Sequence, residues 1–139
     1  MKYFEHTKQS VLEGDIDDFE WIIVDDGSVD GTREYLLGLD DERLKLHLKD
    51  KNSGIEDSYA KGIELAMGKY LLILDHDDTI PQGSLLKRID WLERHPQANA
   101  AFGAVAYMDE KGVIYKESKF PFLSCSCVLP SITILIGIF

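Results

Sequence analysis

Two acidic clusters in the sequence have the residue types and the spacing for metal and phosphate chemistry. Asp25 and Asp26 stand in the stretch VDDGSVDGT, and Asp75, Asp77 and Asp78 stand in LDHDDT. Carboxylates this close together repel one another, and burying them unpaired is costly. Mg²⁺ or Mn²⁺ removes that cost, because these ions prefer oxygen ligands and share them between one or two carboxylates, water and phosphates. The pattern therefore indicates a metal platform that faces a phosphate-bearing ligand.

Each cluster directly follows an apolar run with the length of a buried strand, 21–24 and 70–74. Further strands are expected over 44–48, 101–108 and 113–115, and helices over 4–12, 31–37, 55–67 and 84–95. The helix that begins at 55 is expected to carry Ile55, Tyr59, Ile63 and Ala66 on one face. Because strands alternate with helices, we expect an α/β fold, a three-layer sandwich with a mostly parallel sheet. Ligands of such sheets lie at the carboxyl ends of the strands, where both clusters stand.

The composition limits the classes of function. The chain has 139 residues, 45% of them hydrophobic and 29% charged, with a net charge of −10 and a pI of about 4.7. This length fits one domain with a sizeable core. The acidic balance argues against nucleic acid as a partner and against electrostatic binding to anionic lipid. We expect a cytoplasmic protein, since residues 1–15 lack the apolar core of a signal peptide, with the inner face of the membrane as the alternative location.

A structural role for the acidic residues is the alternative to a ligand site. Asp, Ser and Gly build turns and cap helices, so Ser28 and Asp30, together with the acidic pair before them, could do no more than that. Asp77, Asp78 and Thr79 could likewise form no more than a turn before Pro81. Two such stretches, each closing a buried strand, favour a ligand site over a coincidence of turns. His76 is expected to point away from this site, because neighbouring strand residues face opposite sides.

The segment 120–139 differs from the rest of the chain, because it carries no charge. A membrane-spanning helix needs about 20 apolar residues, and two prolines and several hydroxyl residues interrupt this segment. Its last part, SITILIGIF, is rich in β-branched residues, which favours a buried strand. A tail that belongs to a longer protein and a membrane anchor are the second and third interpretations.

The stretches FEWIIVDDGSVDGT and NSGIEDSYAKGIELAMGKYLLILDHDDTIP resemble the inverting, nucleotide-sugar-dependent glycosyltransferases of family 2, which have the GT-A fold. The similarity runs from about Phe4 to about Tyr115. It implies that 1–119 is the donor-binding part of an incomplete GT-A domain and that 120–139 is an apolar tail of separate role. It also implies a nucleotide-sugar donor, UDP-linked, a divalent metal (Mg²⁺ or Mn²⁺), and a saccharide or lipid-linked acceptor that the residues do not identify.

The same resemblance assigns roles to individual residues. Those that match nucleotide-binding positions are Asp25, Asp26, Ser28, Asn52, Gly54 and Asp75. Those that match the metal-binding D-x-D motif or adjoin it are Asp77, Asp75 and Asp78, with Asp77 as the first choice. The acidic pair would hold the base and ribose, and the N-x-G turn would open the helix behind the donor.

The sequence also departs from the family pattern. Ser58, Tyr59 and Ala60 stand where the family has the Ala, Arg and Asn of A-R-N-x-G. The family's first strand, which lies between the two motif strands, is missing ahead of Phe4, so we expect 132–139 of this chain or of a partner to fill that gap; direct pairing in a dimer is the alternative. No acidic catalytic base is identified, so the catalytic residue is unknown and weak or no transfer by this chain is expected.

Two other functions remain open at this point. The stretch LDHDDT also fits haloacid-dehalogenase-like phosphohydrolases, with Asp75 as nucleophile, Asp77 as acid and base, and Thr79 as a phosphate contact. That interpretation leaves VDDGSVDGT unexplained. The third interpretation is a non-catalytic fragment that binds a nucleotide. A homodimer through exposed strand edges is a further expectation.

Overall fold

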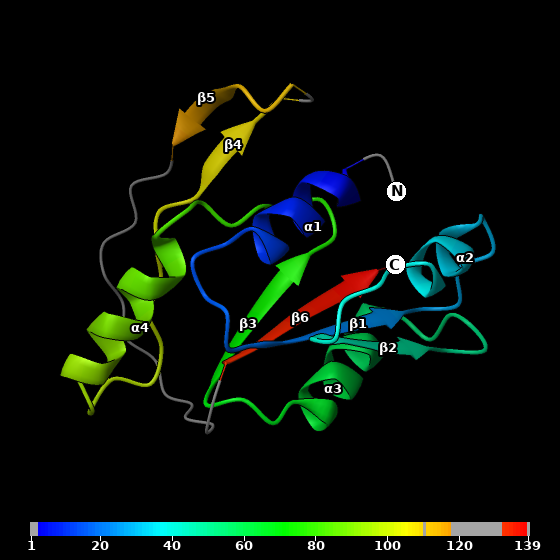
Figure 1. Cartoon of the computed structure of the whole chain (residues 1–139), viewed down its shortest axis with the longest axis horizontal. Helices are drawn as coiled ribbons and strands as arrows, with labels where there is room; N and C mark the ends of the chain where they lie inside the picture. The colour runs from blue at the N-terminus through cyan, green and yellow to red at the C-terminus, as the bar shows by residue number, and fades with distance from the viewer. Residues whose placement is uncertain (1–2, 110, 118–131, 139) are drawn as a thin grey trace. The chain divides into compact units, whose positions relative to one another are not determined.

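The computed structural model describes residues 3–109, 111–117 and 132–138, the last of these by their backbone. The chain forms two compact units, 1–82 with 128–139, and 83–127. The elements of the first unit are α1 (Phe4–Leu12), β1 (Glu20–Asp25), α2 (Thr32–Leu37), β2 (Leu44–Leu48), α3 (Ile55–Leu65), β3 (Tyr70–Asp75) and β6 (Ile132–Ile138) (Figure 1). Those of the second unit are α4 (Ser84–Arg94), β4 (Ala106–Met108) and β5 (Ile114–Glu117).

The first unit is built on a parallel sheet with the strand order β2-β1-β6-β3. Strand β6, red in Figure 1, lies between β1 and β3 and is hydrogen-bonded to both. In register, Ile134 stands between Trp21 of β1 and Leu72 of β3. The expectation that the segment 132–139 fills the gap between the two motif strands is confirmed for Ile132–Ile138, and the strand comes from the same chain.

The two faces of β1 carry different layers, because its side chains alternate. Ile22 and Val24 form a buried cluster against which Tyr59 and other partly buried residues of α3 pack. On the opposite face, the Trp21 ring stacks on Phe4 of α1, with 6.1 Å between ring centroids. These contacts give the expected helix–sheet–helix arrangement, with α3 on one side and α1 on the other.

Strand β3 is less buried than its sequence suggests. The apolar run 70–74 predicts a fully buried strand, yet Leu74 is its only buried residue and Ile73 is 45% exposed. The reason is topological, because β3 is an edge strand among the described residues and pairs only with β6.

The second unit contains α4 and a hairpin. The helix spans the predicted region, but none of its residues is buried in the part of the chain that the structure describes. Strands β4 and β5 pair antiparallel, and the turn between them is closed by a hydrogen bond from Gly112 N to Asp109 O of 2.9 Å. Within the described ranges, no helix combines the length and the apolar character that crossing a bilayer requires.

Candidate functional site

The two acidic clusters meet at one edge of the sheet. Asp25 ends β1 and stands beside Ile138, while Asp75 ends β3 and stands beside Gly137. One strand, β6, therefore separates them, which corresponds to roughly 10 Å between the backbones of β1 and β3 at the usual spacing of strands. The structure brings both predicted clusters to the carboxyl edge that binds ligands in parallel α/β sheets.

Asp25 is fully buried and holds the loop that follows β1. Its carboxylate accepts a hydrogen bond from Arg33 Nε at 2.8 Å and one from Ser28 N at 3.2 Å. Next along the chain, Asp30 accepts hydrogen bonds from the backbone and hydroxyl of Thr32 at the start of α2. Asp25 and Asp30 therefore make the turn and helix-start contacts that the sequence analysis gave as the alternative to a ligand site. Ser28 contributes its backbone N–H to that loop.

Asp26 is also buried, with 2% of its surface exposed, and it anchors the N-x-G turn. Its two oxygens accept hydrogen bonds from Ser53 N at 2.9 Å and Gly54 N at 2.8 Å. Lys49 Nζ lies 2.9 Å from Oδ1. Burial alone would raise the pKa of Asp26, but Ser53 N–H, the Lys49 ammonium and Gly54 N–H outweigh it and lower the pKa to about 2. The carboxylate is therefore held charged at neutral pH.

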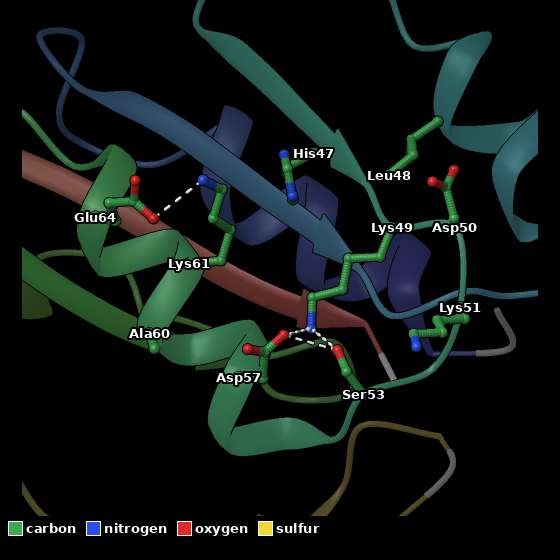
Figure 2. Close-up of a pocket in the computed structure, with 10 residues that line it drawn as sticks. All are labelled: His47, Leu48, Lys49, Asp50, Lys51, Ser53, Asp57, Ala60, Lys61 and Glu64. Carbon is green, nitrogen blue, oxygen red and sulfur yellow. Dashed lines mark hydrogen bonds and ion pairs between the residues drawn. The ribbon is translucent and has the colours of Figure 1, made fainter.

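Lys49 is a residue of this site that the sequence analysis missed. Its side chain is 9% exposed, and Nζ also lies 2.7 Å from Ser53 Oγ, 2.8 Å from Ser58 Oγ and 2.6 Å from Asp57 Oδ2 (Figure 2). Burial would lower the pKa of Lys49, but the carboxylates of Asp57 and Asp26 raise it. The available signal was its position, because it directly follows a strand at the edge where the acidic pair stands.

Gly27 lets the loop after β1 pass close to the loop after β2. Its φ is +84°, and a Cβ at this position would lie 2.5 Å from Asn52 N and 2.6 Å from the carbonyl carbon of Lys51. No other residue type fits both the dihedral angle and the space. Asn52 is thus brought next to the loop that follows β1, and Gly54, with φ of +97°, is the residue before the first turn of α3.

Asp75 is joined to α3 by Tyr59, whose hydroxyl donates a hydrogen bond of 2.7 Å to Oδ1. The Asp75 carbonyl accepts a hydrogen bond of 3.1 Å from Asp78 N, so the residues between them form a tight turn. His76 contributes its carbonyl oxygen, which accepts a 2.8 Å hydrogen bond from Thr7 Oγ1 of α1. Its buried Nδ1 has no hydrogen-bond partner among the described residues.

Asp77 and Asp78 are exposed at this turn. Partial burial, together with the neighbouring carboxylates of Asp75 and Asp77, raises the pKa of Asp78. In the ranges that the structure describes, no three His, Cys, Asp or Glu residues are grouped so that they could hold a metal ion. Mg²⁺ and Mn²⁺ nevertheless bind through one or two carboxylates with water and phosphate oxygens, and the exposed, crowded carboxylates of Asp77 and Asp78 fit that donor chemistry.

Two cavities adjoin the acidic clusters. One, of about 480 Å³, lies between the segment that follows β2 and helix α3, and includes Lys49, Lys51 and Asp57 in its lining (Figure 2). The other, of about 420 Å³, lies between α1 and the segment after Asp78, and includes Thr79 in its lining. Their described lining residues include neighbours of the two clusters, Ser53 and Lys49 in the first cavity and Thr79 in the second, but no carboxylate of the clusters themselves.

A parallel α/β sheet with carboxylates at the carboxyl ends of two strands, one strand apart, is typical of ligand-binding α/β domains, and the comparisons with known proteins identify the family. The family model "Glycosyl transferase family 2" matches residues 2–136. The chain belongs to this family, and its parallel sheet agrees with the GT-A fold that the family implies.

Several curated proteins are similar to the chain. A Bacillus subtilis protein whose name assigns it to the glycosyltransferases of teichuronic acid biosynthesis is 36% identical over 107 residues, 76% of this chain and 41% of the relative. An uncharacterized glycosyltransferase of Methanocaldococcus jannaschii is 31% identical over 121 residues, 85% of this chain and 42% of the relative. The glucosyl-dolichyl phosphate glucuronosyltransferase of Haloferax volcanii is 30% identical over 127 residues, 88% of this chain and 40% of the relative. The chain therefore spans about two fifths of the length of these relatives.

Proposed function

We propose that the chain is the donor-binding part of a glycosyltransferase and binds a nucleotide-diphosphate sugar, UDP-linked, together with Mg²⁺ or Mn²⁺. One observation carries the proposal: two acidic clusters distant in the sequence stand at the same carboxyl edge of the sheet, one strand apart. The whole protein would transfer the sugar to the hydroxyl of a saccharide or lipid-linked acceptor with inversion at the anomeric carbon.

Different residues of the site would bind different parts of the donor. The nucleoside would lie over the loop after β1 and the turn of 52–54, which the buried carboxylates of Asp25 and Asp26 hold in place by hydrogen bonds. Asp77, with Asp75 and Asp78 beside it, would hold the metal through its exposed carboxylate oxygens. The metal, when bound, supplies a positive charge that stabilises the leaving diphosphate. Tyr59 fixes Asp75 from α3 and leaves its second oxygen for the ligand.

The chain by itself is proposed to bind the donor and to transfer sugar slowly or not at all. An acceptor hydroxyl must lose its proton to a general base, a step that contributes about 10²–10⁴-fold to the rate. The sequence identifies no such base, and the Oδ1 atom of Asp109, an acidic residue beyond the second cluster, accepts hydrogen bonds of 2.9 Å from Lys111 N and Val113 N in the β4–β5 turn. Radiolabelled UDP-sugars, Mn²⁺ and a broad acceptor panel would test the transfer; robust glycoside formation would contradict this part of the proposal.

The phosphohydrolase interpretation of LDHDDT makes a different prediction about the same carboxylate. If Asp75 were a nucleophile, beryllium fluoride would bind there as a mimic of an aspartyl phosphate. Membership in glycosyltransferase family 2 favours the transferase instead, in which Asp75 contacts the donor and is never modified. Fluorine NMR of the chain with beryllium fluoride and Mg²⁺ distinguishes the two.

Titration calorimetry with a panel of nucleotides and nucleotide sugars tests the donor proposal. We expect UDP or a UDP-sugar to bind in the presence of Mn²⁺ and to bind more tightly than nucleoside monophosphates, because the diphosphate reaches the metal. Failure of every nucleotide to bind, with and without Mn²⁺, would contradict the proposal. The homodimer remains part of the proposal and is tested separately by analytical ultracentrifugation, because β2 and β3 are each paired on one side within the described residues.

A further inference from the structure

The Lys49 ammonium group is the centre of a buried polar network. Nζ can donate three hydrogen bonds. Four acceptors lie within 2.9 Å of it: Asp26 Oδ1, Ser53 Oγ, Ser58 Oγ and Asp57 Oδ2. All three protons therefore have a partner inside the protein, and Figure 2 shows the amine pointing into the group formed by Ser53 and Asp57. An amine with every proton engaged is suited to fixing its neighbours rather than to moving during a reaction.

This network joins three separate parts of the chain. Asp26 follows β1, Lys49 follows β2, and Ser58 lies in the first half of α3. The backbone reinforces the link, because Lys49 N donates a hydrogen bond of 3.0 Å to the carbonyl oxygen of Asp25. The Ser58 hydroxyl in turn lies 3.2 Å from the carbonyl oxygen of Gly54. Lys49 thus bridges the acidic pair and the turn that opens α3.

The two ion pairs of Lys49 differ in their importance. The side chain of Asp57 is 60% exposed, so that pair is screened by water and contributes little. The side chain of Asp26 is 1% exposed, and its only counter-charge within 4.0 Å among the described residues is Lys49. Removing one partner of a buried pair leaves an uncompensated buried charge. The orientation of the Asp26 carboxylate therefore depends on Lys49 far more than that of Asp57 does.

We propose that Lys49 is a positioning residue of the donor nucleoside site, which holds the Asp26 carboxylate and the 52–54 turn in the arrangement that the nucleoside meets. This inference rests on the proposed function, since it assigns the nucleoside to this edge. Lys49 does not contact the donor in this account; it acts through Asp26, whose oxygens hold Ser53 N and Gly54 N.

The test uses the whole chain and the variants Lys49→Met and Lys49→Arg, with Lys61→Met as the matched control. Lys61 lines the same 480 Å³ cavity as Lys49, but Lys61 pairs with the exposed Glu64 one turn away on α3. NMR hydrogen exchange of the Ser53 and Gly54 amides reports directly on the two bonds to Asp26, and UDP titration with Mn²⁺ reports on the nucleoside site. Amides of β1 serve as the internal reference for global stability.

For Lys49→Met we expect protection of the Ser53 and Gly54 amides to fall roughly tenfold or more relative to β1, and UDP affinity to fall by a similar factor, a change of about 1.4 kcal/mol. Lys49→Arg keeps the charge but not the compact amine. We therefore expect its amide protection and its UDP affinity to lie between those of the wild type and Lys49→Met. Lys61→Met should change neither. If Lys49→Met does not fold, Lys49→Arg is compared with a Lys61→Arg control instead. Loss of protection at the Ser53 and Gly54 amides in Lys49→Arg alone would support the proposal, and equal protection in the two variants would contradict it.

Wild-type protection and wild-type UDP affinity in both Lys49 variants would overturn the inference. The two proposals can fail separately. If no nucleotide binds to the wild-type chain while Lys49→Met still loses protection at Ser53 and Gly54, Lys49 does position the turn and the proposed function is wrong. If UDP binds equally to wild type and Lys49→Met, the function stands and the role of Lys49 is refuted.

Discussion

The hydroxyl of Tyr59 donates a 2.7 Å hydrogen bond to Oδ1 of Asp75, which joins the middle of α3 to the end of β3. Tyr59 stands where the family pattern has an arginine, so a neutral donor contacts the first carboxylate of the D-x-D motif in this chain. The bond fixes the orientation of the Asp75 side chain, while its backbone is held by pairing with β6 and by the hydrogen bond from Asp78 N.

The first prediction is that Tyr59→Phe weakens Mn²⁺-dependent UDP binding without unfolding the chain. Losing one hydrogen bond to a carboxylate releases Asp75 from its fixed orientation and should raise the Kd for UDP roughly three- to tenfold. Calorimetry measures the effect. Tyr35→Phe is the control, because its hydroxyl bonds to Glu5 and Lys8 on α1. An equal loss of affinity in both variants would show that the Tyr59–Asp75 bond has no special role.

The second prediction concerns pH. The pKa of Asp26 is lowered to about 2 from an ordinary value of 3.8, so the unfolded chain binds this proton more readily than the folded one. The stabilisation is fully present above about pH 5 and is lost as the pH falls through 4 toward 2; it amounts to on the order of 2 kcal/mol. Asp26→Asn should lower the free energy of unfolding at pH 7. It should also reduce the loss of that free energy as the pH falls from 5 to 2, which we call the acid limb.

Urea unfolding at a series of pH values from 7 to 2.5 measures this dependence. The exposed Asp50 provides the control, since Asp50→Asn should leave both the stability and its acid limb unchanged. A steep acid limb that persists in Asp26→Asn would assign the dependence to other carboxylates.

The third prediction tests the close approach of the two loops. Gly27→Ala places a methyl group 2.5 Å from Asn52 N at a φ of +84°, so the 51–52 backbone must move; we expect a loss of more than about 3 kcal/mol. Gly31→Ala also forces a residue to a positive φ, of +90°, but meets no atom within 4 Å and should cost about 1 kcal/mol. Equal losses in the two variants would mean that the space beside Gly27 is not filled as described.

The fourth prediction concerns the central strand. Leu135 of β6 pairs with Ile22 on one side and Ile73 on the other, so Leu135→Pro removes a ladder hydrogen bond in the middle of the sheet. We expect a loss of about 3 kcal/mol or more. Leu135→Val keeps the N–H group and should be much milder. Unchanged thermal unfolding of the proline variant would show that β6 does not lie between β1 and β3.

Part of this fold could be predicted from the sequence. The helix Phe4–Leu12 was predicted with the bounds that it has, and the two motif strands to within one residue at each end, because apolar runs bounded by polar residues are a strong local signal. The place of β6 followed from a gap that the resemblance left in the sheet. Both acidic clusters were found because they directly follow those strands.

Other features depend on contacts between distant residues and have no local signal. Ile55, Tyr59, Ile63 and Ala66 were predicted to share one face of the helix. Tyr59 and Ala66 pack against the core, but Ile55 and Ile63 are 46% and 43% exposed, while Ser58 is buried. The helix is turned by about one residue from its apolar face, because Ser58 bonds to Lys49 and Tyr59 to Asp75. For Lys49 the sequence offered only its position directly after a predicted strand, and it is the pairing of β1 with β2 that brings Lys49 to Asp26.

The fifth prediction addresses metal dependence at the D-x-D turn. Asp77→Asn should weaken UDP binding in Mn²⁺ at least tenfold, because it removes the proposed metal ligand from an exposed turn. Asp30→Asn should have little effect, since the hydrogen bonds that Asp30 accepts among the described residues come from Thr32 at the start of α2. Similar losses in the two variants would remove the assignment of Asp77 to the metal.

The central claim is that this edge of the sheet binds a nucleoside diphosphate with a divalent ion. Calorimetric titration of the wild-type chain with UDP, in Mn²⁺ and again in a chelator, tests it most directly. Asp75, Asp77 and Asp78 would repel a diphosphate at close range, so we predict measurable binding in Mn²⁺ and at least tenfold weaker binding in the chelator. Equal affinity in the two conditions, or no binding in either, would contradict the account.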